Sequence, residues 1–120
     1  MKSTLLFDIV KVHNNKMGGF NMYISNWTVR LAPGTAAEVI EVSEAAAKLW
    51  EKHGANECHL LDLQGSDVGC MSFIAQFDNA EAYGKSADSI EADPDFQAVM
   101  DKANAIDGDW VRHNLARRIF

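Results

Sequence analysis

Two histidines are the side chains of this sequence best suited to proton transfer. His59 and His113 each lie in a stretch that predicts a β-strand, at 57–64 and 110–120. Histidine titrates near neutral pH, so it can accept and return a proton during a reaction. A half-buried histidine that is paired with a neighbour is, however, the commoner case. We therefore treat both as candidate catalytic residues and keep the structural interpretation open beside the catalytic one.

The other reactive side chains show no spacing typical of a known site. The His and Cys residues have neither CxxC nor HxxxH spacing, and no glycine-rich nucleotide loop or serine-elbow motif is present. Cys58 and Cys70 come without a secretory context, so we expect reduced thiols that are buried and inert. Asp62 is either a base in a closed cavity or an exposed carboxylate. The sequence therefore predicts no metal site and no cofactor.

Composition and charge limit the partners of the chain. Its 120 residues allow one domain, and 48% hydrophobic with 23% charged residues is ordinary globular composition. The net charge of −6 argues against binding to nucleic acid or to an anionic membrane. The apolar stretch 5–12 is short and interrupted by Asp8 and Lys11, so it fits neither a membrane span nor a signal peptide. We expect a soluble cytoplasmic protein.

The pattern of residues predicts a strand-helix-strand-strand-helix-strand order. β-branched and aromatic residues predict strands at 22–31, 57–64, 70–77 and 110–120. Thr35 and Glu38 fit a capping box that starts a helix, and Gly54 ends that helix. A second helix follows Asn79 and restarts at Pro94.

The loop between the two middle strands predicts their register. If residues 65–69 form the loop, the strands pair as Gln64–Cys70, Leu63–Met71, Leu61–Phe73 and His59–Ala75. Cys58 then lies opposite Gln76, which excludes a disulfide between Cys58 and Cys70.

This order is typical of the α+β class with a ferredoxin-like βαββαβ fold. Right-handed crossovers give a four-stranded antiparallel sheet with the helices on one face. The other face is bare and partly apolar, which indicates that a second copy packs against it. Both faces of the sheet carry mixed side chains, so the sequence does not decide which face meets the helices.

Several short motifs occur in a fairly specific order between Met22 and about Leu115. They are Trp27-x-Val29 running into Pro33-Gly34, Lys52-His53-Gly54, the glycine-bounded hairpin, Phe77-Asp78, Tyr83-Gly84, and Asp93-Pro94-Asp95-Phe96-Gln97. In this order the chain resembles the dimeric α+β barrel superfamily, which includes antibiotic-biosynthesis monooxygenases, stress-responsive A/B barrel proteins and muconolactone isomerase. The resemblance implies a homodimer with a cavity between each sheet and its partner.

The resemblance also implies roles for individual residues. Cofactor-free and haem-degrading monooxygenases of this superfamily use an Asn and a Trp near the cavity, which makes Asn26 a third candidate catalytic residue. Trp27 is expected to pack in the core against a helix. The haem-degrading members place a His ligand on their second helix, and this chain has none there. In the family's dimers the edges of the two sheets meet, so His59 and His113 are expected to approach each other in trans.

Residues 1–21 read differently from the rest of the chain. The segment from Met17 to Met22 could be encoded by a purine-rich ribosome-binding site before a start codon at Met22. We expect residues 1–21 to be an N-terminal extension outside the native protein, and 22–120 to be the α+β barrel domain.

Two functions follow from these expectations. The first is a homodimeric, cofactor-free monooxygenase- or isomerase-type enzyme that acts on a small apolar or phenolic molecule through Asn26, His59 or His113. The alternative is a non-catalytic dimer that binds a small molecule or takes part in a stress response.

Overall fold

The computed structural model describes residues 22–120, and its elements follow the predicted order. The strands are β1 (Tyr23–Leu31), β2 (Glu57–Asp62), β3 (Cys70–Phe77) and β4 (Gly108–Arg117); the helices are α2 (Ala36–Lys52), α3 (Ala80–Glu91) and α4 (Pro94–Ala105), with a short 3-10 turn, η2 (Gly65–Asp67). Residues 1–21, the proposed extension, lie outside the described residues. The domain boundary at Met22 therefore stays a prediction.

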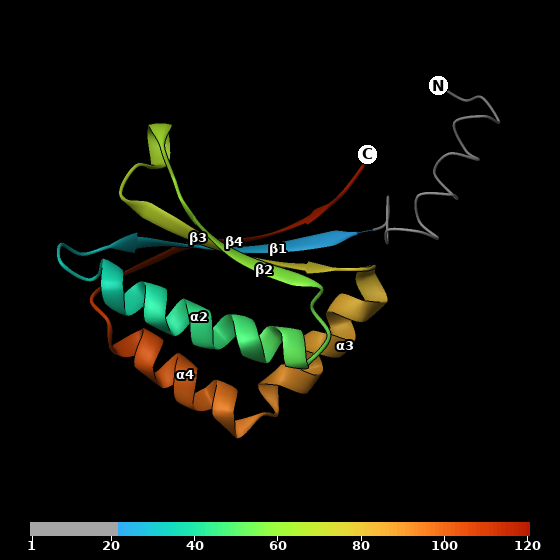
Figure 1. Cartoon of the computed structure of the whole chain (residues 1–120). Helices are drawn as coiled ribbons and strands as arrows, with labels where there is room; N and C mark the ends of the chain where they lie inside the picture. The colour runs from blue at the N-terminus through green and yellow to red at the C-terminus, as the bar shows by residue number, and fades with distance from the viewer. Residues whose placement is uncertain (1–21) are drawn as a thin grey trace.

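The four strands form one antiparallel sheet in the order β2-β3-β1-β4. All three helices lie on the same side of this sheet (Figure 1). The predicted ferredoxin-like α+β fold is therefore confirmed. The order places β2 and β4, which carry His59 and His113, at opposite edges of the sheet, as predicted.

Side-chain caps decide where two of the helices begin. The Asn79 side chain accepts a hydrogen bond from the Ala82 N–H at 2.8 Å, and the Asp93 carboxylate accepts one from the Asp95 N–H at 2.9 Å. The capping box predicted at the start of α2 is wrong. The Thr35 hydroxyl donates to the Ala32 carbonyl at 2.8 Å instead, which stabilises the preceding turn and leaves α2 without a side-chain cap.

The register predicted for the β2–β3 hairpin is wrong by one residue. The structure pairs Leu60 with Phe73 and Cys58 with Ala75. The connection contains the 3-10 turn η2, and the last backbone bond before it joins the Leu63 N–H to the Cys70 carbonyl at 3.0 Å. The loop is thus one residue longer than predicted. Because side chains alternate along a strand, this shift moves every β2 side chain to the other face.

The helix-facing side of the sheet holds the core. Trp50 of α2 and Ile90 of α3 pack there with Ala75 and Phe77 of β3, and Trp27 packs against this cluster as predicted. In the part of the chain that the structure describes, no helix combines the length and the apolar character needed to cross a membrane.

Candidate ligand-binding site

A cavity of about 140 Å³ lies between the helix-facing side of the sheet and helices α2 and α4. Its existence follows from how α4 packs. Helix α4 contacts α2 and α3 more than it contacts the sheet, so a space stays open above β1 and β4. In Figure 1, α4 lies farther from the sheet than α2 does. We name this space the first cavity.

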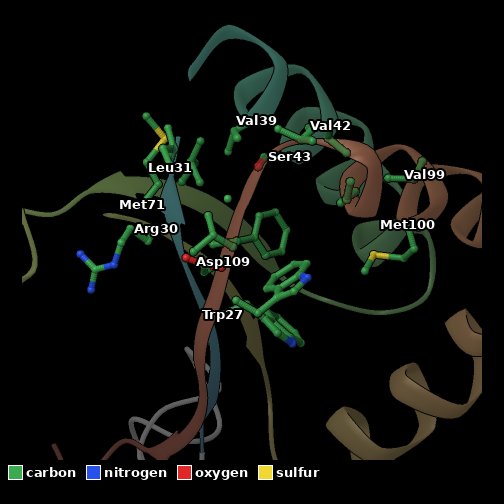
Figure 2. A pocket seen from close by; sticks show the side chains of 18 of the residues that line it. Trp27, Arg30, Leu31, Val39, Val42, Ser43, Met71, Val99, Met100 and Asp109 are labelled. Carbon is green, nitrogen blue, oxygen red and sulfur yellow. The ribbon is translucent and has the colours of Figure 1, made fainter. Parts of the chain in front are cut away.

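Apolar stripes on the two helices face the first cavity. Helix α2 contributes Val39, Val42, Ala46 and Trp50, and helix α4 contributes Phe96, Val99, Met100 and Ala103. Both sets recur at helical spacing, which brings them onto one side of each helix. Figure 2 shows the α2 and α4 side chains on one side of the cavity and Trp27 of β1 on the other.

Aromatic rings form the inner wall of the first cavity. The Trp27 ring centroid lies 5.3 Å from that of Trp50 and 5.8 Å from that of Phe73. Trp50 in turn meets Phe96 edge to face at 6.0 Å. Such packed rings form a rigid apolar surface that suits flat or hydrocarbon groups.

Few polar groups reach the first cavity. Ser43 is the polar side chain that the helices contribute, and the remaining polar residues come from the ends of β1 and β4, among them Arg30 and Asp109. Figure 2 shows the Arg30 guanidinium pointing away from Trp27 and its neighbours. The site therefore offers apolar contact area with little hydrogen bonding, an arrangement that favours binding of an apolar molecule.

A second cavity, of about 390 Å³, adjoins the first at the β2 edge of the sheet. It lies between α2 and the strands β2 and β3, and carboxylates contribute to its lining. Ser43, Leu60, Met71 and Phe73 line both cavities.

The three predicted catalytic residues do not converge within one chain. Asn26 and His59 lie on the helix-free face, and each pairs with Ile74 of the neighbouring strand β3. The His59 imidazole lies 3.6 Å from the Glu57 carboxylate, and His59 also contributes to the edge of the second cavity. Their meeting with residues of a partner subunit stays a prediction.

His113 lies on the opposite, helix-facing side. A bulge in β4 places Trp110 opposite Val29 and His113 opposite Trp27. The imidazole stacks on Trp27 with a centroid distance of 4.6 Å, and its Nε2 lies 2.7 Å from the Ser25 hydroxyl. His113 therefore adjoins the wall of the first cavity through Trp27, although it does not line it.

His53 belongs to a hydrogen-bonded cluster that the sequence did not reveal. Its Nδ1 lies 2.5 Å from the Ser89 hydroxyl, and its Nε2 lies 2.7 Å from the Asp93 carboxylate. The Lys52 ammonium adds a contact to Asp93 at 3.4 Å. The cluster joins the end of α2 to α3 and to the start of α4. It lines neither cavity, so its effect is to hold the helices together.

The cluster holds the pKa of Asp93 at about 2, below its ordinary 3.8. The hydrogen bond with His53 is the main cause, and the Asp95 N–H and the Lys52 ammonium add to it. Because the folded-state pKa is lowered, Asp93 stabilises the fold above about pH 4, and this contribution is lost as the pH falls toward 2.

Replacing Asp93 by Asn should therefore destabilise the protein at neutral pH and matter less in acid. The amide keeps a capping oxygen but loses the charge that His53 and Lys52 stabilise. Urea unfolding between pH 7 and pH 2 measures the difference from the wild type, with Asp88→Asn, an exposed carboxylate of α3, as the control. A difference that stays constant over this range would contradict the assignment.

Both cysteines have the character of inert thiols. Burial, with a smaller effect of the Glu51 carboxylate, raises the pKa of Cys58 to about 12. Cys70 is fully buried, and both thiols are free. By the observed register Cys58 faces the helices and Cys70 faces away from them, so the two cannot form a disulfide. That conclusion matches the prediction, although the pairing of Cys58 with Gln76 on which it was based is wrong.

Residues 22–120 contain no group of three or more His, Cys, Asp or Glu side chains arranged to hold a metal ion.

The sequence predicted the residues that line the first cavity only as buried core residues. The apolar stripe of α4 has the pattern of any buried helix face. The signal in the sequence that indicates a cavity is the presence of two small side chains, Ala46 and Ala103, among larger ones.

Solved structures resemble this chain over most of its length. A NIPSNAP family protein of unknown function from Agrobacterium tumefaciens is 15% identical, with a TM-score of 0.68 over 83% of this chain and 90% of that one. A protein suggested to be an antibiotic-biosynthesis monooxygenase, from Chloroflexus aurantiacus, is 16% identical, with a TM-score of 0.60 over 82% and 94%.

A cofactor-independent oxygenase from Streptomyces nogalater is 22% identical, with a TM-score of 0.55 over 79% of this chain and 88% of that one. No protein-family model and no curated protein matches the sequence. At these identities the likeness concerns the fold, and it confirms the resemblance that the motifs predicted. The chain has the ferredoxin-like α+β fold of these solved structures.

Proposed function

We propose that the protein is a homodimer that binds a small, flat, apolar or phenolic molecule in the first cavity. The observation that carries this proposal is an open space walled by Trp27, Trp50 and Phe96 between the sheet and the helices. Protein interiors are normally filled, so a space of this size lined by apolar groups favours an apolar occupant. The homodimer is supported by the helix-free face, where Ile24 and Ile74 are only partly buried.

Filling the first cavity should weaken binding of such a molecule. Ala46 lines the cavity from α2, so Ala46→Leu places extra carbon atoms in the space that a ligand needs. We expect the affinity for naphthol, followed by quenching of the tryptophan fluorescence, to fall by about tenfold, equivalent to about 1.4 kcal/mol. Ala98→Leu on the exposed side of α4 is the matched control and should bind as the wild type does. Equal affinity in all three proteins would contradict binding in this cavity.

A second candidate is a cofactor-free monooxygenase- or isomerase-type enzyme that uses the same cavity. His113 favours it, because its imidazole is stacked on Trp27 and bonded to Ser25 beside the cavity wall. A fold shared with a cofactor-independent oxygenase is compatible with this reaction class. Asn26 and His59 stay candidates for action across a dimer interface.

Any turnover of a phenolic molecule should be lost in the His113→Ala variant while naphthol affinity is kept. Proton transfer needs the imidazole, whereas binding needs the aromatic wall. Product formation and fluorescence quenching, measured on the same preparation, separate the two. Turnover that survives in His113→Ala would remove His113 from the catalytic candidates.

A further inference from the structure

The two cavities adjoin each other and share four wall residues. Ser43 of α2 and Leu60, Met71 and Phe73 of the sheet line both spaces. The first cavity extends toward the β4 edge, where Trp110 contributes to its lining and is 54% exposed. The second reaches the β2 edge, where Asp62 contributes. The two spaces therefore follow each other along one path between α2 and the sheet.

We propose that the two cavities act as one channel that binds a linear amphiphile, an unbranched apolar chain with a neutral or cationic head group. This inference rests on the proposed binding function of the first cavity and extends it from a single flat ring to a long chain. In the bound state the apolar chain runs from the first cavity through the second, and the head group lies at the β2 edge.

The length of the channel follows from the sheet. Trp110, Val29, Met71 and Asp62 form one row of paired residues that crosses all four strands. Three strand spacings of about 4.8 Å make this row about 14 Å long. A dodecyl chain has a comparable length, whereas a single aromatic ring occupies only one part of the row.

The wall between the cavities is made of side chains that can yield to a chain. Met71 stands in the middle of the row, and methionine has an unbranched side chain that adopts many shapes. Ser43 is the smallest of the four wall residues and adds a hydroxyl beside the path. A rotation of Met71 would connect the two spaces without moving the backbone.

The charges at the ends of the channel select the head group. Glu44 and Asp62 contribute carboxylates at the β2 edge, and Asp107 and Asp109 lie at the β4 end. Arg30, the basic residue that lines the first cavity, points away from it (Figure 2). His59 contributes to the second cavity, and its imidazole lies 3.6 Å from the Glu57 carboxylate. A carboxylate head would meet like charges at either end, whereas an ammonium would be attracted. Because these groups are exposed, added salt should weaken the discrimination.

The first test is a chain-length series on the full chain. Hexanol, octanol, decanol and dodecanol are titrated by calorimetry below their solubility limits. If the channel is continuous, the affinity should rise by about fourfold for each added methylene up to dodecanol, the equivalent of burying one more such group. An affinity that stops rising once the first cavity is full would overturn the channel and leave the proposed function standing. Failure of naphthol to bind would instead overturn the proposed function.

The second test fills the second cavity. Ala47 lines the second cavity and not the first, so Ala47→Leu should lower dodecanol affinity by about tenfold while naphthol affinity stays within about twofold of the wild type. Ser66→Leu in the exposed hairpin is the matched control. A dodecanol affinity that is unchanged in Ala47→Leu would show that the chain does not pass through the second cavity and would overturn the proposal.

The third test concerns the head group. Dodecylamine should bind about tenfold more tightly than dodecanoate at low ionic strength, with both used below their critical micelle concentrations. The double variant Glu44→Gln with Asp62→Asn removes both carboxylates at the β2 edge and should reduce this ratio. A preference for dodecanoate in the wild type would overturn the assignment of the head group.

Discussion

Replacing Trp50 by Ala is expected to lower the free energy of unfolding by about 3–5 kcal/mol. Trp50 is only 6% exposed, and its ring contacts Trp27, Phe77 and Phe96. These partners come from the sheet and from α4, so this one side chain joins α2 to both. Its removal takes away the burial of a large ring and leaves a cavity that rigid aromatic neighbours cannot fill.

Urea unfolding at one fixed protein concentration measures this effect, because the stability of a dimer depends on concentration. The chain supplies its own matched control, since Trp110 is 54% exposed and its indole donates to the Asn104 side chain at 3.2 Å near the surface. Trp110→Ala should cost about 1 kcal/mol or less. Equal losses in the two variants would contradict the central position of Trp50 in the core.

Replacing Ile74 by Lys is expected to convert the proposed homodimer to a monomer. Ile74 occupies the middle of the helix-free face, between His59 and Asn26. In a sheet-to-sheet dimer the residue would lie at the centre of the interface, where truncations and charges have the largest effect on affinity. A buried, unpaired ammonium costs several kcal/mol, which exceeds what one lost apolar contact would cost.

Sedimentation equilibrium of the full chain measures the outcome. Ile40→Lys makes the same exchange on the helical layer, where the side chain is 41% exposed, and should leave the oligomeric state unchanged. A wild-type protein that is already a monomer would remove the homodimer and, with it, any approach of His59 and His113 across an interface. A dimer that persists in Ile74→Lys would place the interface on another surface.

Local sequence was enough to predict the order of the elements. Asn79 and Asp93 cap their helices as their residue types indicate, and Pro94 restarts the helix where its fixed backbone angle is tolerated. The exception, Thr35, shows the limit of such rules. Its hydroxyl bonds the Ala32 carbonyl of the preceding turn and does not cap α2.

The loop between β2 and β3 decides which β2 side chains face the helices. This loop is one residue longer than the sequence predicted. The turn at Gly65–Asp67 lengthens the connection between Leu63 and Cys70, and the resulting shift moves Leu60 and Cys58 to the helices. Periodicity did not reveal this, because both faces of β2 carry apolar and polar residues. A strand with mixed faces has no hydrophobic pattern that selects a register.

The sequence by itself determined the α+β class, the element order and the expectation that the helices share one face of the sheet, because caps, turns and hydrophobic periodicity act within a few residues. Only the tertiary structure decided that Asn26 and His59 share one face while His113 lies on the other. It also decided that α4 packs on α2 and leaves the first cavity open. The size of a cavity depends on how far apart whole elements pack and on how much of that space their side chains fill. No short stretch of sequence determines either quantity.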